Sequence, residues 1–333
     1  MPFEKLHLIA EIGSVHDGSF GNATKLIDLA SECGANAVKF QTHIADCETL
    51  PTAPNPSYFS SESRFEYFKR TSFSFDQWVE LRGHAHNQDL KFISSPFSIE
   101  AVDMLESIRV DAIKVPSGEI SNLPILEKLS YSSRDIIISS GMSDWKELDL
   151  AVDVLSAVKN LSILQCSSIY PCPAEKVGLN VIREMQERYN RPIGLSDHTL
   201  GIGAAIAAVT LGAVVIEKHL TFHRGMYGSD AAHSVEPHEF KLLSDTLHQV
   251  WSMLMNDVKK DDVTPYKDMK EIFEKSLVSK ILINKGEKLS KENLCFKKPG
   301  DGIPASEYKN WLGRISAKDI PPNSKLQPQD FKA

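Results

Sequence analysis

Two histidines are the residues of this sequence whose positions most clearly suggest chemistry. His198 and His219 end the stretches 191–200 and 212–219, each of which begins with apolar residues and finishes with polar, ionisable ones. This pattern is typical of buried parallel strands that end at a site. If the two strands are neighbours, both imidazoles can face one cavity.

Two imidazoles on neighbouring strand ends suit a divalent metal. Such a pair, completed by water, fits Mn²⁺, Fe²⁺ or Co²⁺ with open positions, whereas closed tetrahedral zinc needs more protein ligands. A metal held by His198 and His219 could polarise a carbonyl oxygen as a Lewis acid. The alternative is that each histidine is a core residue satisfied by one hydrogen bond.

Two lysines at other strand ends suit an anion. Lys39 and Lys114 would lie in the mouth of a sheet, where an ammonium needs an anionic or hydrogen-bonded partner. With neighbouring hydroxyls, they would form a receptor for a carboxylate or phosphate. Alternatively, each lysine forms a structural ion pair with Glu11, Glu119 or Glu217.

Further polar residues occupy the predicted strand ends or follow them closely. They are Gln41, Ser94, Ser95, Ser117, Ser139, Ser140, Gln165, Ser167, Ser168, Tyr170, Ser196, Asp197 and Lys218. Asp230 follows in a glycine-containing loop, where it could bind sugar hydroxyls or simply form a turn.

The chain order predicts the scaffold that would bring these residues together. Strands are expected at 6–12, 37–41, 91–95, 111–115, 135–139, 161–165, 192–195 and 213–216, and helices at 22–33, 76–87, 99–107, 124–131, 145–159, 179–189, 202–211 and 237–255. Eight alternating units predict an α/β fold, a closed (β/α)8 TIM barrel with catalytic groups at the carboxyl ends of its strands. A doubly wound open sheet is the alternative, although no Gly-x-Gly-x-x-Gly follows the first strand.

Three segments fall outside this alternation. Residues 43–75 lack periodicity and predict an irregular loop that acts as a lid, or else a disordered insertion, although Tyr58, Phe59, Phe65, Tyr67 and Phe68 favour packing. Residues 257–274 predict a charged linker between a barrel at 1–256 and a small β-rich domain at 275–333. Short strands are expected at 277–283 and 294–296, and a domain of roughly 60 residues should dock on a barrel.

Composition narrows the class of protein. Thirty-seven basic and 44 acidic residues among 333 give a net charge of −7, and no basic run suggests nucleic acid as a partner. No apolar run reaches the ~20 residues of a membrane span and no signal sequence is evident, so we expect a cytoplasmic protein without a membrane partner. The five cysteines form no CxxC pair, which favours free thiols.

The ordered motifs resemble those of the sialic acid synthases, which make nonulosonic acids from phosphoenolpyruvate and an N-acyl-mannosamine-type sugar. The matching motifs are Glu11–Gly13, Val38–Gln41, Ser95–Phe97, Ile113–Glu119, Ser139–Met142, Ile169–Pro171, Leu195–Thr199 and Glu217–His219. Residues 275–331 look like the C-terminal antifreeze-like (SAF) domain of that family, including 298–303 and 312–314.

The resemblance implies a reaction and a set of roles. A metal-activated open-chain aldehyde would be attacked by C3 of phosphoenolpyruvate, water would add to the resulting oxocarbenium centre, and phosphate would leave by C–O cleavage. Phosphoenolpyruvate would be held by Lys39, Lys114, Ser117, Ser139, Ser168, Ser196 and His198. The acceptor sugar would be held by Glu11, Gln41, Tyr170, Asp230 and Lys298. The metal would be Mn²⁺, with Mg²⁺ or Co²⁺ as alternatives, held by His198 and His219. Glu119, Glu11 and His198 would be catalytic, with Glu119 as a base for the water.

The resemblance also implies a domain-swapped homodimer in which each small domain covers the partner's barrel.

Some positions depart from the family pattern: the turn 14–18, Ser168 where some members have Asn, Lys298 where an Arg contacts the acceptor's N-acyl group, and the segments 43–75 and 225–230. The ammonium of Lys298 cannot reproduce the planar fork of a guanidinium. The departures therefore bear on the identity of the acceptor sugar more than on the reaction. N-acetylmannosamine, its 6-phosphate, mannose and a diacetamido-trideoxyhexose remain open.

Two other classes of function remain open. A Schiff-base aldolase would use Lys114 or Lys39 as its nucleophile in the same barrel. A non-enzymatic carbohydrate- or ice-binding protein would rely on the C-terminal domain, but it would leave the ionisable strand ends without a role.

Overall fold

A computed structural model describes residues 5–55 and 62–332. The chain divides into two compact units, Met1–Asn256 and Asp257–Ala333, and each is described by itself. In the described parts of the chain, no helix is both long enough and apolar enough to cross a membrane. The cytoplasmic location stays a prediction.

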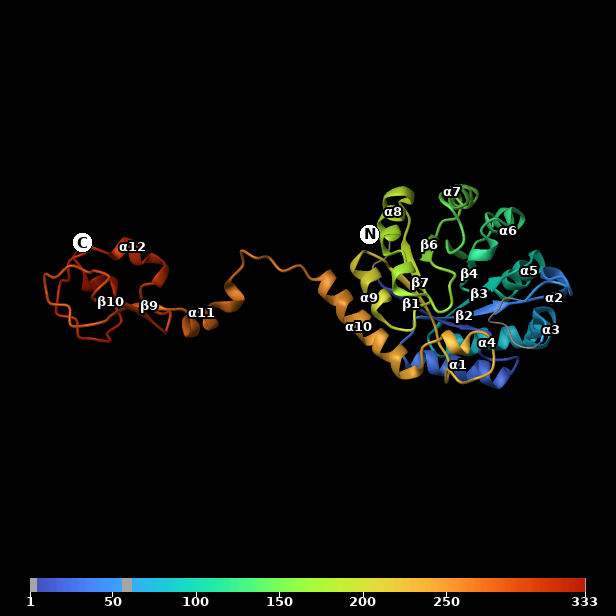
Figure 1. Cartoon of the computed structure of the whole chain (residues 1–333), viewed down its shortest axis with the longest axis horizontal. Helices are drawn as coiled ribbons and strands as arrows, with labels where there is room; N and C mark the ends of the chain where they lie inside the picture. Colours follow the sequence, from blue (N-terminus) through green and yellow to red (C-terminus); the bar gives the residue numbers. More distant parts are fainter. Residues whose placement is uncertain (1–4, 56–61, 333) are drawn as a thin grey trace. The chain divides into compact units, whose positions relative to one another are not determined.

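The first unit is a closed barrel of eight parallel strands (Figure 1). The strands are β1 His7–Gly13, β2 Ala37–Thr42, β3 Lys91–Pro96, β4 Ala112–Val115, β5 Asp135–Ser139, β6 Leu161–Cys166, β7 Ile193–Asp197 and β8 Val215–His219. Closure is made by pairing of β1 with β8, from His7 opposite Val215 to Glu11 opposite His219. This pairing confirms the barrel and rules out the open sheet.

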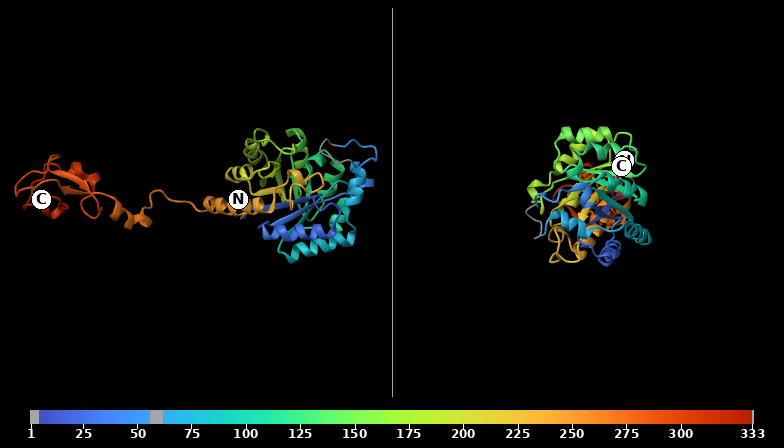
Figure 2. Two further views of the ribbon diagram at one scale, coloured as in Figure 1. Left: turned by 60° about the horizontal axis from the view of Figure 1, so that its bottom comes forward. Right: turned by 90° about the vertical axis from the view of Figure 1, so that its right-hand side faces the viewer.

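Helices surround the barrel on its outside, as the two views in Figure 2 show. The principal ones are α1 Phe20–Glu32, α4 Phe75–Asn87, α5 Ile99–Ile108, α6 Leu123–Leu129, α7 Trp145–Val154, α8 Leu179–Tyr189, α9 Gly203–Thr210 and α10 Pro237–Met255. Their apolar stripes pack on the outward side chains of the strands, such as Phe40 and Phe92, in one large core. The predicted helix at 145–159 was too long, because α7 ends at Val154.

Inside the barrel, an apolar layer lies beneath a polar one. Ile9, Ala37, Ile93 and Ile137 belong to a buried apolar cluster, and each is two residues before a polar residue on the same strand face. At Gly194 in the same interior, an added Cβ would lie 2.8 Å from the Cβ of Val215, so no larger residue fits there. The polar residues at the strand ends therefore lie directly above a packed apolar layer of the barrel interior.

The segment expected to be irregular is partly helical. It contains α2 Ala45–Glu48 and α3 Arg64–Thr71, which begins at the N-cap Ser63. Phe65, Tyr67 and Phe68 are buried with Ala45 in a small cluster, as the aromatic content suggested. The irregular assignment was wrong here because an eight-residue helix shows barely two turns of periodicity. The predicted Tyr58 and Phe59 lie outside the described residues.

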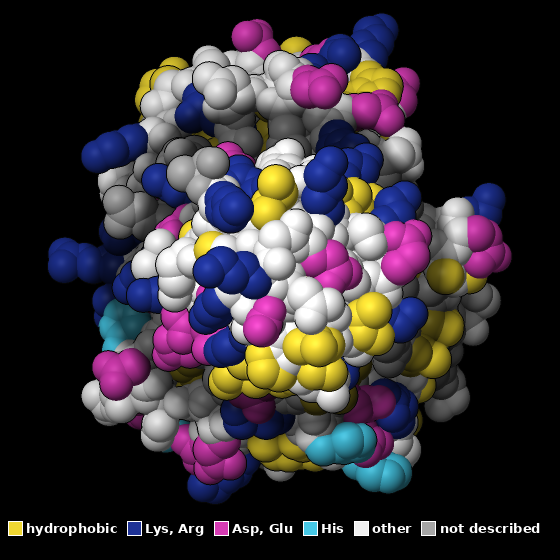
Figure 3. Space-filling model, turned by 90° about the vertical axis from the view of Figure 1, so that its left-hand side faces the viewer, with side chains coloured by type: hydrophobic (Ala, Val, Ile, Leu, Met, Phe, Trp, Pro, Cys, Tyr) yellow, Lys and Arg dark blue, Asp and Glu magenta, His cyan; other side chains and the backbone are white. Residues whose placement is uncertain are grey.

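The second unit is small and built around one two-stranded antiparallel sheet. Strand β9 Ser276–Ser279 pairs with β10 Leu294–Lys297 over a core that includes Leu277 and Trp311. The predicted linker is partly helical, since it contains η4 Thr264–Tyr266 and α11 Lys267–Phe273 before β9. The unit also has η5 Ala305–Glu307, α12 Tyr308–Trp311 and η6 Pro328–Asp330. Figure 3 shows one face of the molecule, on which both signs of charge are interspersed with apolar side chains.

Candidate active site

A cavity of about 290 Å³ opens among the carboxyl ends of the barrel strands. Most of the predicted site residues line it. They are Glu11, Lys39, Gln41, Lys114, Ser117, Ser139, Ser168, Tyr170, Ser196, His198, His219 and Asp230. Ser95 and Glu217 line it as well. With Cys166 of β6, the lining contains residues from all eight strands and from the loops that follow them.

Two lysines and two glutamates form a buried ion-pair network across the cavity. The Nζ atom of Lys39 lies 2.8 Å from Oε2 of Glu11 and 3.8 Å from Oε2 of Glu217. The Nζ atom of Lys114 lies 3.3 Å from Oε2 of Glu217. The ion pairs considered as an alternative are therefore present, with Glu11 and Glu217 as partners. They do not close the cavity, since all four residues still line it.

The electrostatics of this network differ from one member to the next. Burial opposes ionisation of Glu217, but Lys114, Lys39 and a hydrogen bond from Ser196 outweigh it and lower its pKa to about 2. Burial raises the pKa of Glu11 although Lys39 opposes this. Burial also lowers the pKa of Lys114. Glu217 is thus a permanent anion, whereas Glu11 can hold a proton more readily than an ordinary carboxyl.

Hydroxyl groups border the cavity on the side of β4 to β7. The Oγ atom of Ser139 is buried without a hydrogen-bond partner among the described residues. The Oγ atom of Ser117 accepts a 3.0 Å hydrogen bond from the backbone N–H of Gly141, and its hydroxyl also bonds to the Cys166 thiol. A buried polar atom without a partner is costly, so these hydroxyls suit an oxygen-rich ligand.

The two imidazoles lie side by side, with ring centroids 5.5 Å apart. His198 Nδ1 lies 2.8 Å from the carbonyl oxygen of Ser167, so Nδ1 donates there, and in the neutral ring Nε2 carries the lone pair. His219 Nδ1 is buried without a partner in the described part of the chain, and burial lowers the pKa of His219 to about 3. Burial opposes protonation of His198, but the Cys166 thiol and the Ser167 carbonyl outweigh it and raise the pKa of His198. His219 is neutral, and His198 can join it in holding a divalent metal once its proton is displaced. Within residues 5–55 and 62–332, no group of three or more His, Cys, Asp or Glu side chains is arranged to hold a metal.

The wall on the side of β1 and β2 is a chain of hydrogen bonds. Gln41 Nε2 donates to Glu11 Oε1 at 2.9 Å, and Gln41 Oε1 lies 3.2 Å from Nε2 of His43. His43 Nδ1 in turn lies 2.7 Å from Oε1 of Glu48. On the same side, directly after β1, Asp230 Oδ2 accepts a 2.7 Å hydrogen bond from the backbone N–H of Ser14, which fixes this carboxylate.

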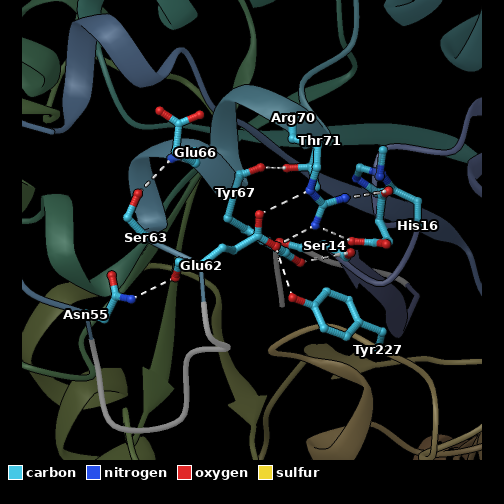
Figure 4. Close-up of polar contacts among 12 residues, drawn as sticks. Ser14, His16, Asn55, Glu62, Ser63, Glu66, Tyr67, Arg70, Thr71 and Tyr227 are labelled. Carbon is cyan, nitrogen blue, oxygen red and sulfur yellow. Dashed lines mark hydrogen bonds and ion pairs between the residues drawn. The ribbon is translucent and has the colours of Figure 1, made fainter.

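A second group of contacts holds α3 to the loops after β1 and β8 (Figure 4). Arg70 on α3 bonds to Asp17 Oδ1 at 2.9 Å and to Glu62 Oε1 at 2.8 Å. Tyr227, from the loop after β8, donates to the same Glu62 oxygen at 3.0 Å. Helix α3, which contributes Arg64 and Phe68 to the cavity lining, is therefore positioned by both loops.

Several predicted residues lie away from the cavity lining. Asp197 and Lys218 point outward from the barrel and form a buried 2.8 Å ion pair, because they occupy the opposite strand face from His198 and His219. Likewise, the residues Ser94, Ser140, Gln165 and Ser167 are not among the lining residues of this cavity.

Glu119 and Lys298 also lie outside the lining. Glu119, in η1 Ser117–Glu119, accepts a 2.7 Å hydrogen bond from Asn122, and burial raises its pKa. Its role as a base for water stays a prediction. Lys298 belongs to the second unit, where its Nζ atom lies 4.7 Å from the ring centroid of Phe273. Its role at the acceptor stays a prediction as well.

Sequence reasoning missed several residues that line the cavity: Ser14, His43, Arg64, Phe68, Phe97, Met142, Cys166, Ser229 and His233. His43 could have been found, because it continues the alternation of Lys39 and Gln41 beyond β2. Arg64 and Phe68 could not, because the helix that carries them was not predicted. Cys166 has the same strand phase as Leu164, but it was considered only as a free thiol.

The fold and the cavity define a class: a (β/α)8 barrel with an ionisable site at its carboxyl face, followed by a small separate β-rich unit. The model of the NeuB family matches residues 26–259, and the model of the SAF domain matches residues 274–332. The chain therefore belongs to the NeuB family and carries a C-terminal SAF domain.

Individual relatives agree with this assignment. The N,N'-diacetyllegionaminic acid synthase of Campylobacter jejuni is 36% identical over 325 residues, covering 95% of this chain and 97% of that protein. The human N-acetylneuraminate-9-phosphate synthase is 34% identical and covers 92% of this chain and 87% of its own length. The crystal structure of N-acetylneuraminic acid synthetase from Leptospira borgpetersenii has a TM-score of 0.70 at 28% identity, covering 80% of this chain and 90% of that one.

Proposed function

We propose that this protein condenses phosphoenolpyruvate with an N-acyl-mannosamine-type aldose, giving a nonulosonic acid and phosphate with the help of a divalent metal. The observation that carries this proposal is a cavity in which ammonium and carboxylate groups accompany buried polar atoms of Ser139 and His219 that have no hydrogen-bond partner within 5–55 and 62–332. The relatives, which are named as synthases of nonulosonic acids, support the same reaction class.

Phosphoenolpyruvate would bind on the side of β4 to β7. Lys114 supplies a positive charge there, the unpaired hydroxyl of Ser139 can donate, and the hydroxyls of Ser117, Ser168 and Ser196 also line this side. The network of two lysines and two glutamates is formally neutral when all four are ionised. A proton on Glu11, favoured by its raised pKa, would leave the network one positive charge to set against the anionic donor.

The metal would be held by His198 and His219, with Mn²⁺ first and Mg²⁺ or Co²⁺ as alternatives. When bound, it supplies Lewis acidity toward the carbonyl oxygen of the acceptor aldehyde. The protein's part is to fix the two rings. The hydrogen bond from His198 to the Ser167 carbonyl sets one imidazole, and burial keeps His219 neutral.

In the reaction itself, C3 of phosphoenolpyruvate forms a bond to the aldehyde carbon, whose oxygen takes up a proton. Water then adds to C2 and gives a proton to a base, and the C–O bond to phosphate breaks. Glu11 lines the cavity and has a raised pKa, so it fits one of these proton transfers. Asp230, held by Ser14, would orient the sugar hydroxyls.

One observation favours the alternative of a Schiff-base aldolase. Burial lowers the pKa of Lys114, as a nucleophilic amine requires. Incubation with pyruvate and borohydride would modify this lysine in an aldolase, while EDTA would leave that activity intact. The synthase is expected to behave in the opposite way.

We also propose that the protein forms a homodimer, as the family resemblance implies. Helix α11 exposes several apolar side chains, with Met269 at 53%, Ile272 at 56% and Phe273 at 54%. A contiguous exposed apolar patch of this kind is typical of an interaction surface.

The test of the main proposal is release of phosphate from phosphoenolpyruvate in the presence of Mn²⁺. The acceptors to compare are N-acetylmannosamine, its 6-phosphate, mannose and a 2,4-diacetamido-2,4,6-trideoxymannose. We expect phosphate release that depends on one of these sugars and is abolished by EDTA. Release that is absent with all four, in metal-loaded folded protein, would contradict the proposal.

A further inference from the structure

Arg64 is a cation of the cavity wall that has no acidic partner among the described residues. It lies at the first position of α3 and lines the cavity. Its Nε atom is buried without a hydrogen-bond partner in the described part of the chain, and no carboxylate there pairs with its guanidinium. Arg70 on the same helix differs, because Asp17 and Glu62 both pair with it. A half-buried guanidinium left with free donors calls for an oxygen acceptor from a ligand.

Aromatic rings stand beside this guanidinium. The Arg64 Cζ atom lies 5.6 Å from the ring centroid of Phe68. The imidazole of His43 is stacked between Phe68 and Phe97, with centroid distances of 3.7 and 4.2 Å. All four residues line the cavity. The wall therefore offers flat apolar surface next to a few N–H donors, which suits a ligand group that has both a methyl and an oxygen.

We propose that Arg64, with Phe68 and Phe97, forms a subsite for an N-acylamino group on the part of the acceptor remote from its aldehyde. The inference rests on the proposed function and narrows its substrate class to aldoses with two acylamino groups. The carbonyl oxygen accepts hydrogen bonds from the guanidinium, and the methyl contacts the rings. The imidazoles that would serve the aldehyde end lie at β7 and β8, whereas α3 follows β2.

A phosphate at this position fits the wall less well. Oε2 of Glu48 is buried beside His43 without a hydrogen-bond partner among the described residues, and its negative charge disfavours an anion. The N-terminus of α3 offers little help, because Ser63 already caps the backbone N–H of Glu66. Phosphate sites usually gather several such donors.

The experiment compares two acceptors in the full-length protein with Mn²⁺ and phosphoenolpyruvate. These are 2,4-diacetamido-2,4,6-trideoxymannose and N-acetylmannosamine, which lacks the second acylamino group. The variants are Arg64→Met and Arg64→Lys, and Lys69→Met on the same helix is the matched control, since Lys69 lies over the Phe65 ring. Melting temperatures show that each variant is folded.

We expect Arg64→Met to raise the KM of the diacetamido sugar about tenfold or more, since a charge-assisted hydrogen bond is lost. The KM values of N-acetylmannosamine and phosphoenolpyruvate should change less than about threefold, Arg64→Lys should be intermediate, and Lys69→Met should resemble the wild type. Equal losses with both sugars would overturn the subsite. A wild-type preference for N-acetylmannosamine 6-phosphate that Arg64→Met removes would show an anion site instead. If the wild type releases phosphate with none of the sugars tested, the proposed function itself fails, and this inference fails with it.

Discussion

His16 makes the stability of the barrel depend on pH in a way that can be calculated. The imidazole is buried, with its ring centroid 4.6 Å from that of Phe73. Its Nδ1 atom accepts a 3.1 Å hydrogen bond from the backbone N–H of Gly18, which requires an unprotonated nitrogen (Figure 4). Burial is the main cause that lowers the pKa of His16 from 6.5 to about 4; Asp230 opposes this and His43 adds to it.

The sign follows from proton binding. Below pH 6.5 the unfolded chain binds a proton at His16 that the folded protein binds only near pH 4, so stability falls as the pH falls through this window. With 1.36 kcal/mol for each unit of pKa, the full loss is about 3 kcal/mol below pH 4. Between pH 7.5 and 5.5 the loss is about 1.3 kcal/mol.

Urea unfolding followed by tryptophan fluorescence at pH 7.5, 6.5 and 5.5 measures this loss in the wild type and in His16→Asn. The asparagine keeps a hydrogen-bond acceptor but does not titrate. The variant is expected to be less stable at pH 7.5, because it lacks the ring contacts. The difference between the two proteins should then shrink by about 1.3 kcal/mol by pH 5.5. A constant difference across this range would refute the buried neutral imidazole.

The remaining predictions concern the metal, the donor and the assembly. His219→Ala should abolish turnover with an unchanged melting temperature, as should EDTA in the wild type; a near-normal rate would remove this residue from the metal site. Ser139→Ala should raise the KM of phosphoenolpyruvate about tenfold, because a hydrogen bond to an anion is lost. Ser140→Ala, a change outside the cavity, should leave this KM unchanged. If both substitutions changed the KM equally, Ser139 would not contact phosphoenolpyruvate. Light scattering should give twice the chain mass for the wild type and for Tyr131→Asp, and a lower mass for Ile272→Asp; a monomeric wild type would contradict the homodimer.

Strand alternation was the most reliable guide to the site. Residues two apart on one strand, such as Lys39 and Gln41, were predicted to share a face, and both line the cavity. The same rule predicts that Asp197 and Lys218 face outward, although both are among the polar residues at the predicted strand ends. Their buried ion pair belongs to the shell between strands and helices, apart from the cavity that the strand ends line.

The identity of the ion-pair partners was not available from the sequence. Lys114 pairs with Glu217, which is 103 residues away, while Glu119 five residues on bonds to Asn122 instead. The sequence left Glu11, Glu119 and Glu217 open as partners, and proximity along the chain could not choose among them. Only the closed barrel, in which β4 and β8 face each other across the interior, decides which charges meet.

The sequence by itself determined the barrel and the strand ends that bear its ionisable groups, because periodicity and turn residues are local properties of the chain. The tertiary structure alone decided how those groups divide between cavity and shell, and which polar atoms remain without partners. It also decided that α3 lies at the cavity. Such facts depend on contacts between distant segments, since a side chain's burial and charge environment are set by everything packed around it.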